Sequence, residues 1–195
     1  MNTMDNHTPR RLFVALSLPR AVVDFLEQMQ KSLKNRGFKA SWSRMEAMHL
    51  TLKFIGETPT ENLESIIRAV QTTAAAHHRF KLKVQGVGVF PSTRKARVLW
   101  AGAGWENRDL SEIYQVLESN LGQAGIPLSK KRFFPHFTLA RFRKAVDHQQ
   151  IADVMDAFGN HSSASFECRS IDLVQSVLKS SGAVHTLVAR ADFKP

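Results

Sequence analysis

The chain contains one short phrase twice, and this duplication constrains its fold more than any other feature. His49-Leu-Thr51-Leu and His136-Phe-Thr138-Leu lie 87 residues apart. In a strand, residues i and i+2 point to the same face. Each phrase therefore predicts a strand that presents an imidazole and a hydroxyl side by side on one face, with apolar residues on the other.

The order strand, helix, His strand, helix, strand also occurs twice. Apolar alternation and turn signals predict strands at 12–18, 48–55, 80–90, 97–103, 134–142, 166–178 and 184–193. Apolar stripes predict helices at 21–33, 60–77, 107–123 and 146–158. The repetition predicts an α+β fold of two pseudo-symmetric lobes, each a small antiparallel sheet with helices packed outside. Facing sheets would bring His49 and His136 together across a cleft.

Length and charge set the broader limits. The 195 residues fit one compact domain, and we expect residues 1–10 to form a flexible leader and residues 11–195 a single bilobal domain. Lys and Arg outnumber Asp and Glu by 27 to 17, and the net charge of +10 favours a polyanionic partner. The single cysteine, Cys168, excludes an intramolecular disulfide. No apolar run reaches the length of a membrane span, so we expect a cytoplasmic protein that does not bind membranes. We also expect the protein to be a monomer.

The side chains of the repeated phrase point to acid–base chemistry. Imidazole is the side chain whose ordinary pKa lets it give or take a proton near neutral pH. Two copies offer one acid and one base, which is the pair that phosphodiester cleavage needs. His49 and His136 are therefore the candidate catalytic residues, and the hydroxyls of Thr51 and Thr138 are candidates to hold phosphate oxygens.

Arg141 is a further candidate for phosphate binding, but its position raises a geometric question. It lies five residues after His136, so a regular strand would point it to the opposite face. Two alternatives remain at this point. Either the strand bends or bulges and Arg141 joins the site as a charge-assisted clamp, or Arg141 is a surface charge.

Basic and aromatic residues lie near the second His phrase in the sequence. Such residues carry RNA phosphates and stack RNA bases in many proteins. The candidates for RNA contacts are Lys130, Arg132, Phe134 and Trp42. The alternative is that Phe134 and Trp42 are core residues.

The sequence shows no motif for a metal or a nucleotide cofactor. There is no H-E-x-x-H motif, no group of cysteines, no carboxylate-rich phrase beside the His motifs and no Gly-rich phosphate loop. We therefore expect no catalytic metal and no cofactor.

Four stretches of the chain resemble a known family. They are Arg11 to Pro19 (RLFVALSLP), Met48 to Glu57 (MHLTLKFIGE), Gly88 to Ser92 with Arg97 to Trp100, and Pro135 to Arg141 (PHFTLAR). Together they resemble the two-histidine (2H) phosphoesterase superfamily and, within it, the RNA 2′,3′-cyclic phosphodiesterases first described as 2′-5′ RNA ligases. The resemblance spans residues 11 to 193, without departure at the His, Thr or Arg positions.

This resemblance implies a specific reaction. The expected activity is metal-independent hydrolysis of 2′,3′-cyclic phosphate ends of RNA to 2′-phosphates, with His49 as proton donor and His136 as base. The residues alone leave either histidine free to take either role. Three alternatives stay open: 2′-5′ RNA ligation, a non-catalytic RNA-binding module on the same fold, and a metal-dependent hydrolase.

Overall fold

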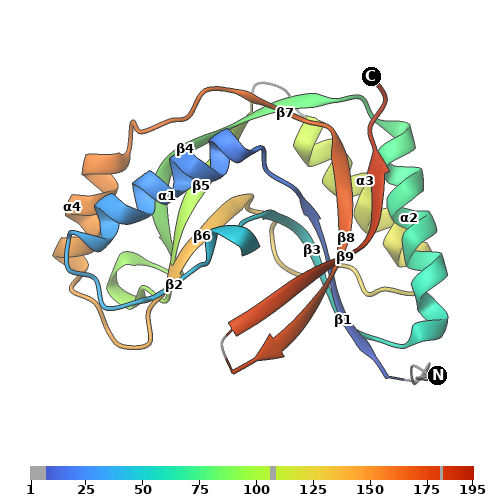
Figure 1. Cartoon of the computed structure of the whole chain (residues 1–195), viewed down its shortest axis with the longest axis horizontal. Helices are drawn as coiled ribbons and strands as arrows, with labels where there is room; N and C mark the ends of the chain where they lie inside the picture. The colour runs from blue at the N-terminus through green and yellow to red at the C-terminus, as the bar shows by residue number, and fades with distance from the viewer. Residues whose placement is uncertain (1–7, 106–108, 181) are drawn as a thin grey trace.

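The computed structural model describes residues 8–105, 109–180 and 182–195. The chain forms two halves, each a sheet with helices against it, and Figure 1 shows α1 and α4 beside one sheet and α2 and α3 beside the other. The helices are α1 (Arg20–Lys34), α2 (Leu63–Ala76), α3 (Asp109–Gln123) and α4 (His148–Phe158), with short 3₁₀ turns η1 (Met45–Ala47), η2 (Thr60–Asn62) and η3 (Thr93–Lys95). The strands are β1 (Arg10–Leu16), β2 (Ser41–Trp42), β3 (Leu50–Thr58), β4 (Phe80–Phe90), β5 (Val98–Trp105), β6 (His136–Arg141), β7 (Phe166–Cys168), β8 (Ser170–Lys179) and β9 (Gly182–Asp192).

Two antiparallel sheets carry the fold. Sheet A has the strand order β3-β1-β8-β9, and sheet B has the order β2-β6-β5-β4-β7. In each sheet a His strand (β3 or β6) pairs with a central strand (β1 or β5), which pairs on its other side with β8 or β4. The prediction of an α+β fold with two small antiparallel sheets is confirmed.

The two lobes exchange chain segments, so neither lobe is one half of the sequence. Strand β4 comes from the first half of the chain but joins sheet B, whereas β8 comes from the second half and joins sheet A. Helix α1 follows a strand of sheet A but packs on sheet B, where the Gln30 amide donates to the Leu139 carbonyl oxygen at 3.1 Å. Helix α3 follows a strand of sheet B but packs on sheet A through the Lys53–Glu118 ion pair.

The two His strands bury one face and leave the other partly open. On β6, Phe137 and Leu139 are fully buried, whereas His136 and Thr138 are only half-buried. Around β3, Leu50 and Leu52 are buried in the same way, and His49 and Thr51 are not. The apolar residues of each phrase thus fix the strand against the core, and the polar residues occupy what we call the inner face of each sheet.

Several predicted boundaries differ from the structure. The predicted strand 48–55 continues past Gly56 to Thr58, because Gly56 has a φ of 95° and allows a bulge in which Ile55 has no partner on β1. The predicted strand 166–178 breaks at Arg169 into β7, which pairs with β4, and β8, which pairs with β1. The expected leader falls mostly outside the described residues, and its last residue, Arg10, begins β1.

No helix among the described residues is long and apolar enough to cross a membrane.

Candidate active site

The two motif histidines are held in the same way at the start of equivalent strands. His49 immediately precedes β3, and its Nδ1 lies 2.7 Å from the carbonyl oxygen of Ala47. His136 is the first residue of β6, and its Nδ1 lies 2.7 Å from the carbonyl oxygen of Phe134. Because a carbonyl oxygen only accepts, each Nδ1 carries the proton and donates it, which leaves each Nε2 free for chemistry.

Each His strand contains a bulge three residues after its histidine. The register of β1 with β3 runs from Val14 opposite Lys53 to Ala15 opposite Thr51, so Leu52 has no partner. The register of β5 with β6 omits Leu139 in the same way. Each bulge makes two successive residues point away from the inner face, since Leu139 and Ala140 are fully buried and Leu52 and Lys53 are also buried.

The bulge on β6 answers the question about Arg141. With one extra residue pointing to the core, Arg141 returns to the inner face that carries His136 and Thr138. The Arg141 side chain is exposed, and its charge is close enough to lower the pKa of His136. The structure therefore brings His136, Thr138 and Arg141 to one face. Of the two alternatives for Arg141, this placement agrees with a bulged strand and not with a regular one.

The equivalent position on β3 holds Phe54, which sequence reasoning missed. Phe54 lies five residues after His49 and is 67% exposed, an unusual exposure for a phenylalanine. Its ring packs against Phe13 on the inner face, with centroids 6.0 Å apart. The two halves of the site thus differ, because one carries a cation where the other carries an aromatic ring.

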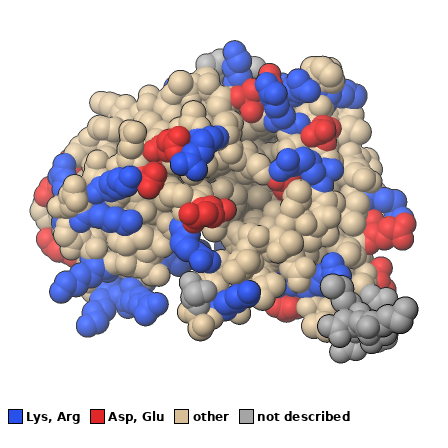
Figure 2. Space-filling model, in the orientation of Figure 1, with Lys and Arg blue, Asp and Glu red and all other residues tan. Residues whose placement is uncertain are grey.

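The two motif imidazoles are close enough that charge on His136 affects the pKa of His49. Strands β3 and β6 approach each other, and Figure 2 shows a hollow between the two halves of the molecule. Burial lowers the pKa of His49 to about 4, against the opposing effect of the Ala47 carbonyl, and charge on His185 and His136 lowers it further. Burial also lowers the pKa of His136, with Arg141 as a smaller cause. Both histidines are therefore neutral at pH 7 without substrate, and an anionic phosphate between them would favour the protonated form.

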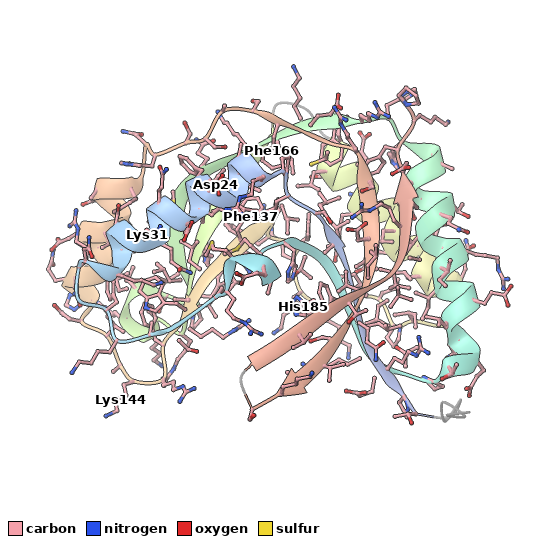
Figure 3. All side chains as sticks on the ribbon, in the orientation of Figure 1. Asp24, Lys31, Phe137, Lys144, Phe166 and His185 are labelled. Atoms are coloured by element: carbon pink, nitrogen blue, oxygen red, sulfur yellow. The ribbon has the colours of Figure 1, made fainter. Side chains whose placement is uncertain are left out.

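His185 is a third histidine at the site. Figure 3 shows it on β9, near the middle of the view. Its ring lies edge-on to His49 with centroids 5.2 Å apart, and it also contacts Phe13. A strand over residues 184–193 was predicted here, but no sequence signal indicated that this strand would bring His185 to the motif histidine.

The candidate RNA-binding residues divide into two groups. Phe134 is 48% exposed and packs beside Trp100, whereas Lys130 and Arg132 are exposed on the segment leading into β6. Trp42 lies elsewhere, because it pairs with the buried Ala140 and its ring lies beneath the Lys34 ammonium of α1. The structure does not bring Trp42 to the histidines.

Neither the cysteine nor a cluster of metal-ligating side chains adds a reactive group to the described part of the site. Burial raises the pKa of the Cys168 thiol to about 12, so this cysteine is an inert core residue. Within residues 8–105, 109–180 and 182–195, no three His, Cys, Asp or Glu side chains gather as metal ligands.

Comparison with known proteins identifies relatives over most of the chain. The family model of LigT-like phosphoesterases matches residues 16–100 and 106–185. An RNA 2′,3′-cyclic phosphodiesterase of Thermus thermophilus is 33% identical over 185 residues, covering 92% of this chain and 88% of the relative. One of Methanocaldococcus jannaschii is 26% identical, covering 91% and 98%. The crystal structure of TT0787 of Thermus thermophilus superposes with a TM-score of 0.78 at 27% identity, covering 94% and 98%.

Proposed function

The chain belongs to the LigT-like phosphoesterase family, and on that premise we propose that it hydrolyses 2′,3′-cyclic phosphate ends of RNA to 2′-phosphomonoesters. One observation carries the proposal: two histidines, on pseudo-symmetric strands, each hold Nδ1 on a carbonyl oxygen and leave Nε2 free. The relatives named RNA 2′,3′-cyclic phosphodiesterase supply the substrate class, and the net charge of +10 suits RNA.

The reaction needs one proton removed and one supplied. His136 takes a proton from water, whose oxygen attacks the phosphorus and forms the new P–O bond. The bond from phosphorus to the ribose O3′ breaks, and His49 gives its proton to that leaving oxygen. The product carries a 2′-phosphate and a 3′-hydroxyl, and no metal is required for either transfer.

This division of roles follows the resemblance to the two-histidine phosphoesterases, because the pKa shifts do not distinguish the two histidines. Burial is the largest cause that lowers the pKa of both, with charge on His185 and His136 as a further cause at His49 and charge on Arg141 at His136. The neutral imidazole that a base requires is therefore favoured at both positions. The negative charge of the bound phosphate favours the proton that His49 must carry.

The remaining inner-face groups suit the phosphate. The hydroxyls of Thr51 and Thr138 donate to its non-bridging oxygens, one from each sheet. Arg141 adds a charge-assisted hydrogen bond that strengthens as negative charge grows on these oxygens in the transition state.

The test is a defined oligonucleotide ending in a 2′,3′-cyclic phosphate, incubated with the protein in excess EDTA. We expect complete conversion to a 2′-phosphate, identified by ³¹P NMR. A 3′-phosphate product, or loss of turnover in EDTA, would contradict the proposal. Adding RNA with a 5′-hydroxyl end separates hydrolysis from 2′-5′ ligation, since a joined strand would show that the hydroxyl replaces water. Binding without turnover would indicate an RNA-binding module.

A further inference from the structure

Gln30 is a polar side chain on the buried face of α1, and the proposed reaction gives it no role. The other buried residues of this helix are Val22, Leu26, Met29 and Leu33, and Gln30 itself is only 3% exposed. A buried amide costs free energy unless its hydrogen bonds are made, and an apolar side chain of the same length would fill the space without that cost. Packing alone therefore does not account for an amide at this position.

The Gln30 amide has two N–H groups, and two backbone carbonyl oxygens of the β2 and β6 region accept from it. Its Nε2 donates to the carbonyl oxygen of Leu139 at 3.1 Å and to that of Ser43 at 2.9 Å. Leu139 lies on β6, and Ser43 directly follows β2, the strand that pairs with β6. One buried side chain thus connects α1 to both strands.

The acceptor on β6 is the bulged residue itself. Leu139 has no partner on β5, because the register of the two strands omits it. Its carbonyl oxygen accepts from the Gln30 amide and also from the backbone N–H of Ser43, at 2.9 Å. These two bonds hold the backbone of the extra residue in place, so they favour the bulge over regular pairing.

The bulge decides which face of sheet B carries Arg141. A shift of one residue in a strand moves every following side chain to the opposite face. In a regular β6, Arg141 would share the buried face of Phe137 and Leu139. With the bulge, it lies on the inner face with His136 and Thr138.

We propose that Gln30 is a positioning residue for the reaction: its amide holds the β6 bulge that turns Arg141 toward the substrate phosphate. The inference rests on the proposed function, because it takes that phosphate to be the ligand of Arg141. Gln30 packs against the buried side of β6 and acts only through Arg141. A small displacement of a binding group is enough to lower the rate of a reaction that depends on its position.

The test removes the amide and keeps the packing. Gln30→Met retains a long unbranched side chain but loses both donors. We expect kcat/KM for a 2′,3′-cyclic-phosphate oligonucleotide to fall by about tenfold. Combined with Arg141→Ala, the same substitution should lower kcat/KM no further than Arg141→Ala alone, because no guanidinium is left to misplace.

Thr73→Val is the matched control. Thr73 is a fully buried polar residue of α2, and its hydroxyl donates to the carbonyl oxygen of Ala69 and accepts from Asn120. Helix α2 packs on sheet A, away from the β6 bulge. Thr73→Val should therefore change kcat/KM by less than about twofold, with or without Arg141→Ala.

The double-variant comparison separates positioning from general stability. Effects of Gln30→Met and Arg141→Ala that multiply would overturn the proposal, because Gln30 would then act by another route. Wild-type kcat/KM in Gln30→Met would overturn it as well. If Gln30→Met does not fold, Gln30→Asn takes its place, since its amide is one methylene shorter and cannot reach both carbonyl oxygens.

An NMR titration of His136 keeps this inference separate from the proposed reaction. Burial lowers the pKa of His136 and the charge of Arg141 lowers it further, while His49 is the ionisable group that its charge affects on the other sheet. Gln30→Met leaves that burial and His49 unchanged. If Arg141 turns away, the pKa of His136 should therefore rise toward its value in Arg141→Ala, whereas Thr73→Val should leave it in place.

This titration does not depend on turnover. A protein that converted no cyclic phosphate but showed the rise in the pKa of His136 would lack the proposed function and keep the positioning role of Gln30. An unchanged pKa of His136 in the folded Gln30 variant would overturn the positioning role, whatever the turnover.

Discussion

At the scale of single residues, the site depends on Arg141 reaching the inner face. Its pairing in the sheet and its effect on the pKa of His136 both place it beside the proposed base. We expect Arg141→Ala to lower kcat/KM for a 2′,3′-cyclic phosphate by about a hundredfold, because a charge-assisted bond to the transition state is lost.

Arg143 offers the matched control for this substitution. It is also exposed and lies two residues further along the chain, beyond the end of β6. Arg143→Ala should change kcat/KM by less than about threefold, as expected for the loss of one exposed charge. Equal effects of the two substitutions would mean that general positive charge, and not a clamp, is responsible.

His185 adds a pH-dependent effect at the residue scale. Charge on His185 lowers the pKa of His49, while burial of His49 is the larger cause. Replacing His185 by phenylalanine keeps a ring against His49 and removes the charge, so the pKa of His49 rises. A proton donor loses activity as the pH rises through its pKa, and the alkaline limb of the kcat profile should therefore move to higher pH.

NMR titration of His49 together with the kcat profile checks this effect. Burial and, to a smaller extent, the charge of Arg44 lower the pKa of His185. Arg44 and Phe13 both stay in place in this variant. A limb that stays in place or moves to lower pH would show that His185 has only a packing role.

At the scale of elements, one buried ion pair fixes α3 to sheet A. Lys53 donates to Glu118, to the Pro127 carbonyl oxygen and to Ser129, and Lys53 and Glu118 are both buried. Burial raises the pKa of Glu118, but the bonds from Lys53 and Ser129 outweigh this and hold it below its usual value. Lys53→Met should cost about 3 kcal/mol of unfolding free energy, because it leaves a buried carboxylate unpaired.

Urea denaturation measures this cost against an exposed pair. Arg68 and Glu64 form an ion pair on the surface of α2, and Arg68→Ala should cost less than about 0.5 kcal/mol. The double variant Lys53→Met/Glu118→Leu should recover most of the loss, since no charge is left buried. A single Lys53→Met variant as stable as Arg68→Ala would show that the pair does not hold the element.

The limits of sequence reasoning also lie at the scale of elements. The alternation of apolar residues was sufficient to predict most of the helices and strands, including β4 at its observed bounds. It could not show that Leu52 and Leu139 would bulge, because both are ordinary apolar residues in an alternating pattern. It also could not divide β7 from β8, because a change of pairing partner leaves no mark on local hydrophobicity.

At the scale of the whole molecule, the sequence was sufficient to predict two similar lobes. It was not sufficient to predict which strands and helices each lobe contains. Two His phrases in matched contexts indicated two sheets that face each other. The exchange of β4, β8 and the helices between the lobes depends on packing between distant segments, for which no local pattern exists. The exchange ties the lobes together, so the distance between His49 and His136 depends on the entire fold and not on a hinge between two halves.

The most direct test of the account is turnover of a 2′,3′-cyclic-phosphate oligonucleotide by His49→Ala, His136→Ala and the double variant, each confirmed as folded by circular dichroism. If the two histidines act as one acid–base pair, each single variant should lower kcat by about 10²- to 10⁴-fold. The kcat of the double variant should be only slightly below that of the less active single variant, because an acid–base pair that acts as a unit loses its function when either histidine is removed. Wild-type turnover in either single variant would contradict the account.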